Sequence, residues 1–112
     1  MNMKNILDQI TDAMRLQVQG DKVTTPLSVL KQSPFYNRTC YDFKRSIKKG
    51  SGVIAEFKRK SPSKGYINAD ANLQEITKGY EKAGASAVSI LTNGPYFGGK
   101  NQFVSTAREF LS

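Results

Sequence analysis

Histidine is absent from this chain, and cysteine occurs once, as Cys40. A disulfide within the chain is therefore impossible, and we expect neither a Cys/His zinc site nor any other metal site. A Ser-His-Asp or Cys-His nucleophile needs an imidazole base, so this chain cannot supply one by itself. Apolar runs are only a few residues long, which predicts no membrane-spanning segment. Asp8 and Asp12 lie where a secretory signal needs an apolar core, which favours a cytoplasmic protein.

Acidic residues are also few. The 112 residues include 9 Asp and Glu against 17 Lys and Arg, which gives a formal net charge of +8. This balance favours an anionic partner, such as a phosphate, a carboxylate, a nucleic acid or an anionic membrane surface, without choosing among them. The length suggests one small domain or a piece of a larger one.

Apolar periodicity predicts helices and strands in a regular order. We expect helices over about 3–19, 26–33, 41–49 and 71–83 and from 101 onward, strands over about 52–58 and 85–91, and loops over 59–70 and 92–100. Glycine at positions 20, 50 and 84 is expected to end the helix before it. Thr25 and Asp70 are the expected N-caps of the helices that follow them. The second strand is apolar almost throughout, which is typical of burial on both faces.

The order strand-helix-strand-helix after residue 51 implies parallel strands joined by right-handed crossovers. Two parallel strands alone leave their outer edges unpaired and apolar faces uncovered, so we expect this chain either to self-associate through unpaired strands or to be poorly ordered. A closed barrel of eight such units needs roughly 200 residues or more. The sequence therefore predicts an α/β fold of the (β/α)₈ TIM-barrel type, present here as a helical N-terminal extension (residues 1–50) and the first two βα units (residues 51–112).

The end of the first strand carries the most informative residues. An apolar run at 53–55 leads into Glu56, Phe57 and Lys58. Glu56 and Lys58 are two residues apart, so on a strand their side chains point to the same face. Opposite charges at the carboxyl end of a strand are typical of a site at the mouth of an α/β barrel. An ion pair on an exposed strand explains the same two residues without any catalytic role.

Three ordered segments of the sequence resemble one known family. They are IAEFKRKSPSKG (54–65), YEKAGASAVSILT (80–92) and YFGG (96–99). The first is similar to the first-strand signature of the indole-3-glycerol phosphate synthase family, and the others to its next helix and strand and to the loop after that strand. The helical lead-in also resembles this family's N-terminal extension.

The resemblance implies a lyase of tryptophan biosynthesis that closes an indole ring with decarboxylation and dehydration of 1-(2-carboxyphenylamino)-1-deoxyribulose 5-phosphate. This small anionic substrate carries a carboxylate and a phosphate, and the family needs no cofactor or metal. By resemblance, Glu56 takes part in proton transfer and orients neighbouring groups, while Lys58 contacts the substrate as a charge or an acid. Ser61 and Pro62 match the loop on the carboxylate side of the substrate. Phe97 matches an aromatic residue that packs against the anthranilate ring.

The resemblance also implies groups that lie beyond Ser112. These are the general-acid lysine of the third strand, a second catalytic glutamate and the phosphate-binding loops near strands 7 and 8. We therefore expect the isolated chain to be inactive. Two alternatives remain open: a non-catalytic relic of the enzyme, which would share every motif, and a small basic nucleic-acid-binding module. The second would use the basic cluster 58–64 with Phe57 and Tyr66 as stacking groups.

Overall fold

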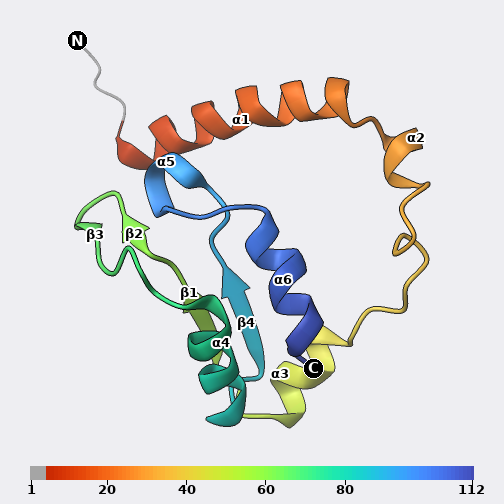
Figure 1. Ribbon diagram of the computed structural model, residues 1–112, viewed down its shortest axis with the longest axis vertical. Coiled ribbons are helices and arrows are strands. Elements are labelled where there is room, and N and C mark those ends of the chain that lie inside the picture. The colour runs from red at the N-terminus through yellow and green to blue at the C-terminus, as the bar shows by residue number, and fades with distance from the viewer. Residues whose placement is uncertain (1–4) are drawn as a thin grey trace. The chain divides into compact units, whose positions relative to one another are not determined.

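The computed structural model describes residues 5–112, and the chain divides between Tyr41 and Asp42 into two compact units. The first unit contains helices α1 and α2, and the second contains the remaining elements (Figure 1). The expected start of the first helix, at residue 3, lies outside the described residues.

Helix α1 spans Ile6–Thr24, longer than the sequence predicts. Its N-cap is Asn5, whose side chain accepts a hydrogen bond from the first turn. The prediction that Gly20 ends this helix is wrong, because the backbone stays helical and the N–H of Thr25 donates to the carbonyl of Asp21 at 2.7 Å. A glycine inside a helix costs only about 1 kcal/mol, and a continuous ladder of hydrogen bonds on both sides offsets it.

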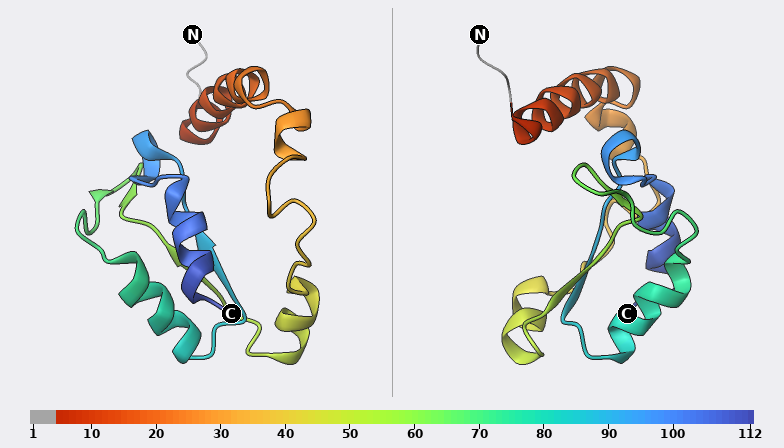
Figure 2. Two further views of the ribbon diagram at one scale, coloured as in Figure 1. Left: turned by 45° about the vertical axis from the view of Figure 1, so that its right-hand side comes forward. Right: turned by 90° about the vertical axis from the view of Figure 1, so that its left-hand side faces the viewer.

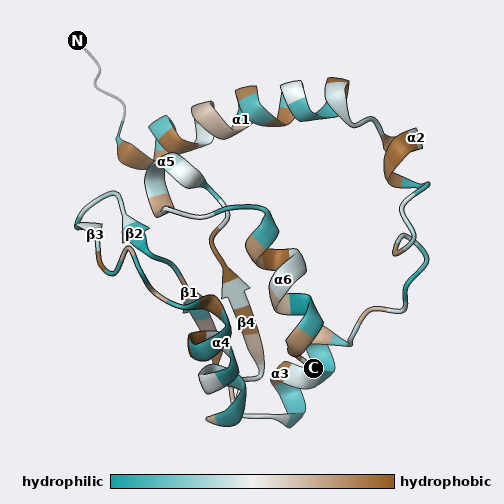
Figure 3. Cartoon of the chain, in the orientation of Figure 1, coloured by the Kyte–Doolittle hydropathy of each residue, from teal (hydrophilic) through white to brown (hydrophobic). Residues whose placement is uncertain are grey.

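Helix α2 is the short segment Leu27–Leu30, and turns follow it where the helix was expected to reach residue 33. Pro26 is its N-cap, without a side-chain hydrogen bond, so the prediction that Thr25 caps it is wrong. Thr25 instead closes the last turn of α1. No residue of α1 or α2 is buried, although apolar positions recur along both helices (Figure 3).

The second unit is built on a parallel pair of strands, β1 (Ile54–Phe57) and β4 (Ala87–Ile90), as the sequence predicts. The pairing runs in register from Ile54 with Ala87 to Phe57 with Ile90. Helices α4 (Leu73–Lys82) and α6 (Gln102–Phe110) lie on the same side of this pair (Figure 2). Within residues 5–112 this sheet has two strands, and no barrel closes.

The core of the second unit lies between the sheet and these helices. Phe57 is only 2% exposed, and its ring meets the ring of Phe103 edge to face, with centroids 5.8 Å apart. Leu73 of α4 and Ala107 of α6 are buried in the same cluster. The core therefore anchors the last residue of β1, next to the charged residues of interest.

Helix α3 (Phe43–Lys49) also belongs to the second unit. Its N-cap is Asp42, whose carboxylate accepts a hydrogen bond from the N–H of Arg45 at 2.9 Å. The helix ends at Gly50, as expected.

A network of serine hydroxyls joins α3 to the amino-terminal ends of β1 and β4. Ser46 donates a hydrogen bond to the carbonyl of Ser86, and Ser51 donates to the carbonyl of Gly84 at 2.6 Å. The hydroxyl of Ser86 accepts from the N–H of Gly52 at 2.9 Å. These bonds fasten the two strand starts to each other and to α3.

The segment 59–70, which the sequence predicts as a loop, contains a small antiparallel hairpin. Its strands are β2 (Lys60–Ser61) and β3 (Gly65–Tyr66). The hydroxyl of Ser61 accepts a hydrogen bond from the N–H of Lys64 at 3.2 Å and so closes the turn. Two-residue strands have no periodicity to detect, which is why sequence analysis misses them.

The N-cap of α4 is Asn72, not Asp70. The side chain of Asn72 accepts from the N–H of Glu75 at 2.9 Å, three residues along. The helix therefore begins two residues later than predicted, since the cap must stand directly before the first turn. Gly84 follows the C-cap with a φ of 99°, a left-handed conformation that favours glycine, so the predicted end is confirmed.

Strand β4 is half-buried along its whole length, so the prediction that both its faces are buried is wrong for the described chain. On β1, Ile54 is 53% exposed. Helices α4 and α6 lie on one side of the pair (Figure 2), and within the described residues no third strand pairs with its edges.

The Gly-rich loop after β4 contains a short helix, α5 (Gly94–Phe97). The side chain of Asn93 caps it by accepting from the N–H of Tyr96 at 2.7 Å. Gly98 ends it with a φ of 65°, which a residue with a Cβ rarely adopts. Across residues 5–112, no helix has the length and apolar character needed to cross a membrane.

Candidate functional site

Glu56 and Lys58 extend from the same face at the carboxyl end of β1, as their spacing predicts. The Nζ atom of Lys58 lies 3.9 Å from Oε1 of Glu56, and the two side chains are 38% and 46% exposed, respectively. Phe57, between them, points the other way into the core. The buried ring holds the strand in place, and the two opposite charges remain accessible to a ligand.

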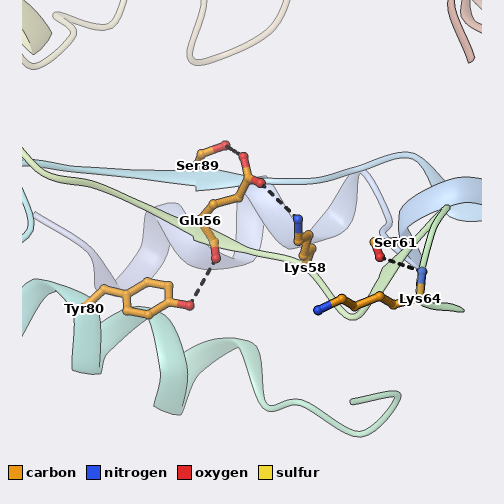
Figure 4. Close-up of polar contacts among 6 residues, drawn as sticks. All are labelled: Glu56, Lys58, Ser61, Lys64, Tyr80 and Ser89. Carbon is orange, nitrogen blue, oxygen red and sulfur yellow. Dashed lines mark hydrogen bonds and ion pairs between the residues drawn. The ribbon is translucent and has the colours of Figure 1, made fainter. Parts of the chain in front are cut away.

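Two hydroxyl groups from other elements also contact Glu56 (Figure 4). Ser89 of β4 donates to Oε2 of the carboxylate at 3.0 Å, and Tyr80 of α4 donates to the backbone carbonyl of Glu56 at 3.1 Å. One contact fixes the side chain and the other the main chain. Sequence reasoning assigned no role to either hydroxyl.

Ser61 and Pro62 lie in the hairpin that follows Lys58. Ser61 is 8% exposed, and its hydroxyl oxygen is engaged by the N–H of Lys64 (Figure 4). The hydroxyl can still donate its own hydrogen to a ligand. Pro62 is exposed. The structure thus makes Ser61 part of the turn and leaves Pro62 at the surface of the hairpin.

Phe97 is half-buried at the end of α5. Helix α5 contacts β2, and Nζ of Lys60 donates to the carbonyl of Pro95 at 2.9 Å. The segments that follow β1 and β4 therefore meet at the carboxyl end of the parallel pair, where α/β barrels carry their active sites. The structure brings the helix of Phe97 to the strand of Ser61.

Comparison with known proteins places the chain in one family. A family model described as indole-3-glycerol phosphate synthase matches residues 7–112. The chain belongs to the indole-3-glycerol phosphate synthase family. A protein of that name from Bacteroides thetaiotaomicron is 41% identical over 110 residues, which cover 97% of this chain and 42% of the relative.

Other relatives carry the same name. The protein from Ruminiclostridium cellulolyticum is 34% identical over 110 residues, which cover 96% of this chain and 42% of that protein. The one from Neisseria meningitidis serogroup C is 50% identical over 60 residues, which cover 54% of this chain and 23% of that protein. The chain therefore spans about two fifths of the length of the curated relatives that it matches along its whole length. The indole-3-glycerol phosphate synthases are TIM-barrel enzymes, and the parallel βαβ arrangement is consistent with that fold.

In this member of the synthase family, sequence reasoning missed the role of Arg59. Its Nε and Nη2 atoms donate to the carbonyl of Ala71 at 3.1 and 2.8 Å, and its guanidinium lies 4.9 Å from the ring centroid of Phe103. The only signal in the sequence is alternation, which puts Arg59 on the same side as Phe57. This clamp ties the end of β1 to the start of α4 and to α6.

The structure and the family match do not favour the nucleic-acid-binding alternative. Phe57 is buried in the core and cannot stack on a base. Two of the basic groups, Arg59 and Lys60, are already bound to backbone carbonyls.

Proposed function

We propose that this chain carries the first part of an indole-3-glycerol phosphate synthase. Residues 1–50 form the helical extension and residues 51–112 the first two βα units of the barrel. The order β1, α4, β4, α6 and the family match over 7–112 support this division. The compact units divide earlier, after Tyr41, because α3 packs beside β4. The proposed boundary at residue 50 follows the start of the barrel strands instead.

The proposed reaction is the closure of an indole ring on 1-(2-carboxyphenylamino)-1-deoxyribulose 5-phosphate, with loss of carbon dioxide and water. An aromatic carbon attacks a carbonyl group, so an acid must deliver a proton to the carbonyl oxygen. Loss of the carboxylate as carbon dioxide then restores the aromatic ring. Departure of the hydroxyl group as water needs a further proton on that oxygen and the removal of a proton from the neighbouring carbon. Such chemistry needs acid and base groups at the same end of the barrel.

Glu56 and Lys58 are the proposed catalytic groups in this chain. The ammonium group of Lys58 would bind the negative charge of the substrate or donate a proton, and the carboxylate of Glu56 would move protons and orient its neighbours. The observation that carries this proposal is their placement: opposite charges 3.9 Å apart, partly exposed, at the carboxyl end of β1. An ion pair this exposed contributes little to stability, so stability alone is a weak reason for its presence.

Ser61, Pro62 and Phe97 are the proposed substrate-binding residues. Ser61 and Pro62 would meet the substrate's carboxylate side, and Phe97 would pack against the anthranilate ring. The contact between α5 and β2 supports a shared role, because it joins the two segments that carry these residues. The anionic substrate also suits a chain of net charge +8. A phosphorylated substrate is retained inside cells, which agrees with the proposed cytoplasmic location.

The isolated chain is proposed to be inactive, because it lacks the third-strand lysine and the phosphate loops of the family. It would also self-associate through the uncovered strand pair, which size-exclusion chromatography with light scattering would detect. A monomeric species with a cooperative thermal transition contradicts this second expectation.

A chimera tests the proposed function. Residues 1–112 are joined to the part of the Bacteroides thetaiotaomicron protein that follows its matched segment, and product formation is followed by indole fluorescence. We expect activity from the chimera and none from the 112 residues alone. The Glu56→Gln chimera should lose activity, while Glu109→Gln, at an exposed position of α6, serves as the control that keeps it. A folded but inactive chimera would refute the proposal and favour the relic.

A further inference from the structure

The two oxygens of the Glu56 carboxylate have different surroundings. Oε2 accepts a hydrogen bond from the hydroxyl of Ser89 at 3.0 Å, whereas Oε1 faces Nζ of Lys58 at 3.9 Å (Figure 4). A distance of 3.9 Å is longer than an N–H···O hydrogen bond, so Oε1 and the ammonium group do not hydrogen-bond to each other and both can still bond to a ligand.

The strand register explains why Ser89 reaches this carboxylate. Glu56 and Ser89 are direct partners in the parallel pair, so their side chains stand on the same face. The other residues of β4 are Ala87, Val88 and Ile90. The one hydroxyl of this strand therefore stands beside the one carboxylate of β1.

A hydrogen bond from Ser89 has a definite effect on a glutamate side chain. The terminal torsion of glutamate is broad, so an unrestrained carboxylate rotates and exchanges its two oxygens. The Ser89 hydroxyl pins Oε2, and Tyr80 holds the backbone carbonyl of the same residue at 3.1 Å. Oε1 is then the oxygen held toward Lys58 and available to a substrate.

We propose that Ser89 is a positioning residue of the synthase site, which fixes the Glu56 carboxylate so that Oε1 alone carries out proton transfer. This inference rests on the proposed function of Glu56. It assigns Ser89 no contact with the substrate. The hydroxyl acts through the carboxylate, and its loss lowers turnover more than substrate binding.

A matched pair of variants in the chimera tests the role of the hydroxyl. Ser89→Thr keeps the hydroxyl and Ser89→Val replaces it by a methyl group of the same shape, and both residues suit a strand. We expect the Thr variant to retain most of the turnover. The Val variant should lose between about tenfold and a hundredfold in kcat, the scale of a misplaced catalytic group, with KM little changed. Equal kcat values for the two variants would overturn the proposal.

A double-mutant cycle separates positioning from a general structural role. If Ser89 acts only through Glu56, then Ser89→Val should cause no further loss of activity in a Glu56→Gln background. An equal loss in both backgrounds would overturn the proposal, because Ser89 would then act independently of the carboxylate.

Crystal structures of the Thr and Val chimeras give a readout that does not depend on activity. We expect a single Glu56 conformer with the hydroxyl present, and a rotated or multiply oriented carboxylate without it. An unchanged carboxylate in the Val variant would overturn the positioning role and leave the proposed function intact. An inactive but folded parent chimera, in contrast, would refute the proposed function, and these structures would still decide what Ser89 does to Glu56.

Discussion

The two ends of the parallel pair β1–β4 are held by different kinds of contact. At the amino-terminal end, the hydroxyls of Ser46, Ser51 and Ser86 bond to backbone groups across α3, β1 and β4. At the carboxyl end, Glu56 and Lys58 stand partly exposed with opposite charges. Barrel enzymes separate stability and chemistry in this way between the two ends of their strands.

The difference shows how one short strand serves two purposes. Neutral hydroxyl–backbone bonds satisfy the strand starts without any accessible charge. The carboxyl end instead keeps two charges accessible, and stability comes from groups on the opposite face, Phe57 and the Arg59 clamp. Substitutions of the charged residues at the carboxyl end should therefore lower activity. Substitutions of the serines at the amino-terminal end should lower the free energy of unfolding.

The largest effect is expected from Lys58→Met in the chimera. Removing the ammonium group should lower kcat/KM between about a hundredfold and ten-thousandfold, the usual range for an acid-base group, and leave the melting temperature nearly unchanged. Lys78→Met, at an exposed lysine of α4, is the control and should change neither quantity. Full activity of the Lys58→Met variant would contradict the assignment of the chemistry to the carboxyl end of β1.

A smaller effect is expected at the start of α4. Asn72→Ala should lower the free energy of unfolding by about 0.5–2 kcal/mol, because it removes the N-cap bond to the N–H of Glu75. Asp70→Ala should change it by less than about 0.5 kcal/mol, as expected for a surface residue that is not the cap. Urea denaturation of the chimera measures both, and a larger loss at Asp70 would mean that the helix begins where the sequence alone suggests.

The smallest effect is expected at the amino-terminal end. Ser86→Ala should lower the unfolding free energy by about 0.5–1.5 kcal/mol, since the N–H of Gly52 loses its acceptor. The specific activity of the folded protein should stay the same. Ser105→Ala, which removes only a hydroxyl bond within α6, is the matched control. A change in kcat for Ser86→Ala would show that the two ends are not independent.

Sequence analysis predicted those parts of the fold that depend on periodicity. The parallel pairing of β1 with β4 and the common face of Glu56 and Lys58 follow from alternating strands and helices and from the two-residue repeat of a strand. The glycine stop at Gly84 follows from its left-handed conformation. The shared face and the glycine stop are encoded within a few neighbouring residues, whereas the strand pairing follows from the order of strands and helices after residue 51.

The features that were missed depend on residues far apart in the chain. Ser89 meets Glu56 only because of the strand register, and Arg59 meets Ala71 only after the hairpin has folded back. The hairpin strands and α5 are too short for a periodic pattern. The choice of Asn72 over Asp70 as cap is local but ambiguous, since both residue types suit that position. The way in which Ser61, Pro62 and Phe97 would meet a ligand also depends on residues far from them in the chain, which local sequence patterns do not encode.

The inward position of Phe57 between two charged residues has a consequence for folding accuracy. If the register of β1 against β4 shifted by one residue, Phe57 would turn toward water, while Glu56 and Lys58 would face the ring of Phe103. Burying two charges there costs several kcal/mol, so the misaligned strand is strongly disfavoured. The charges of Glu56 and Lys58 therefore also help to select the correct strand register, and replacing both residues with apolar ones would remove that selection.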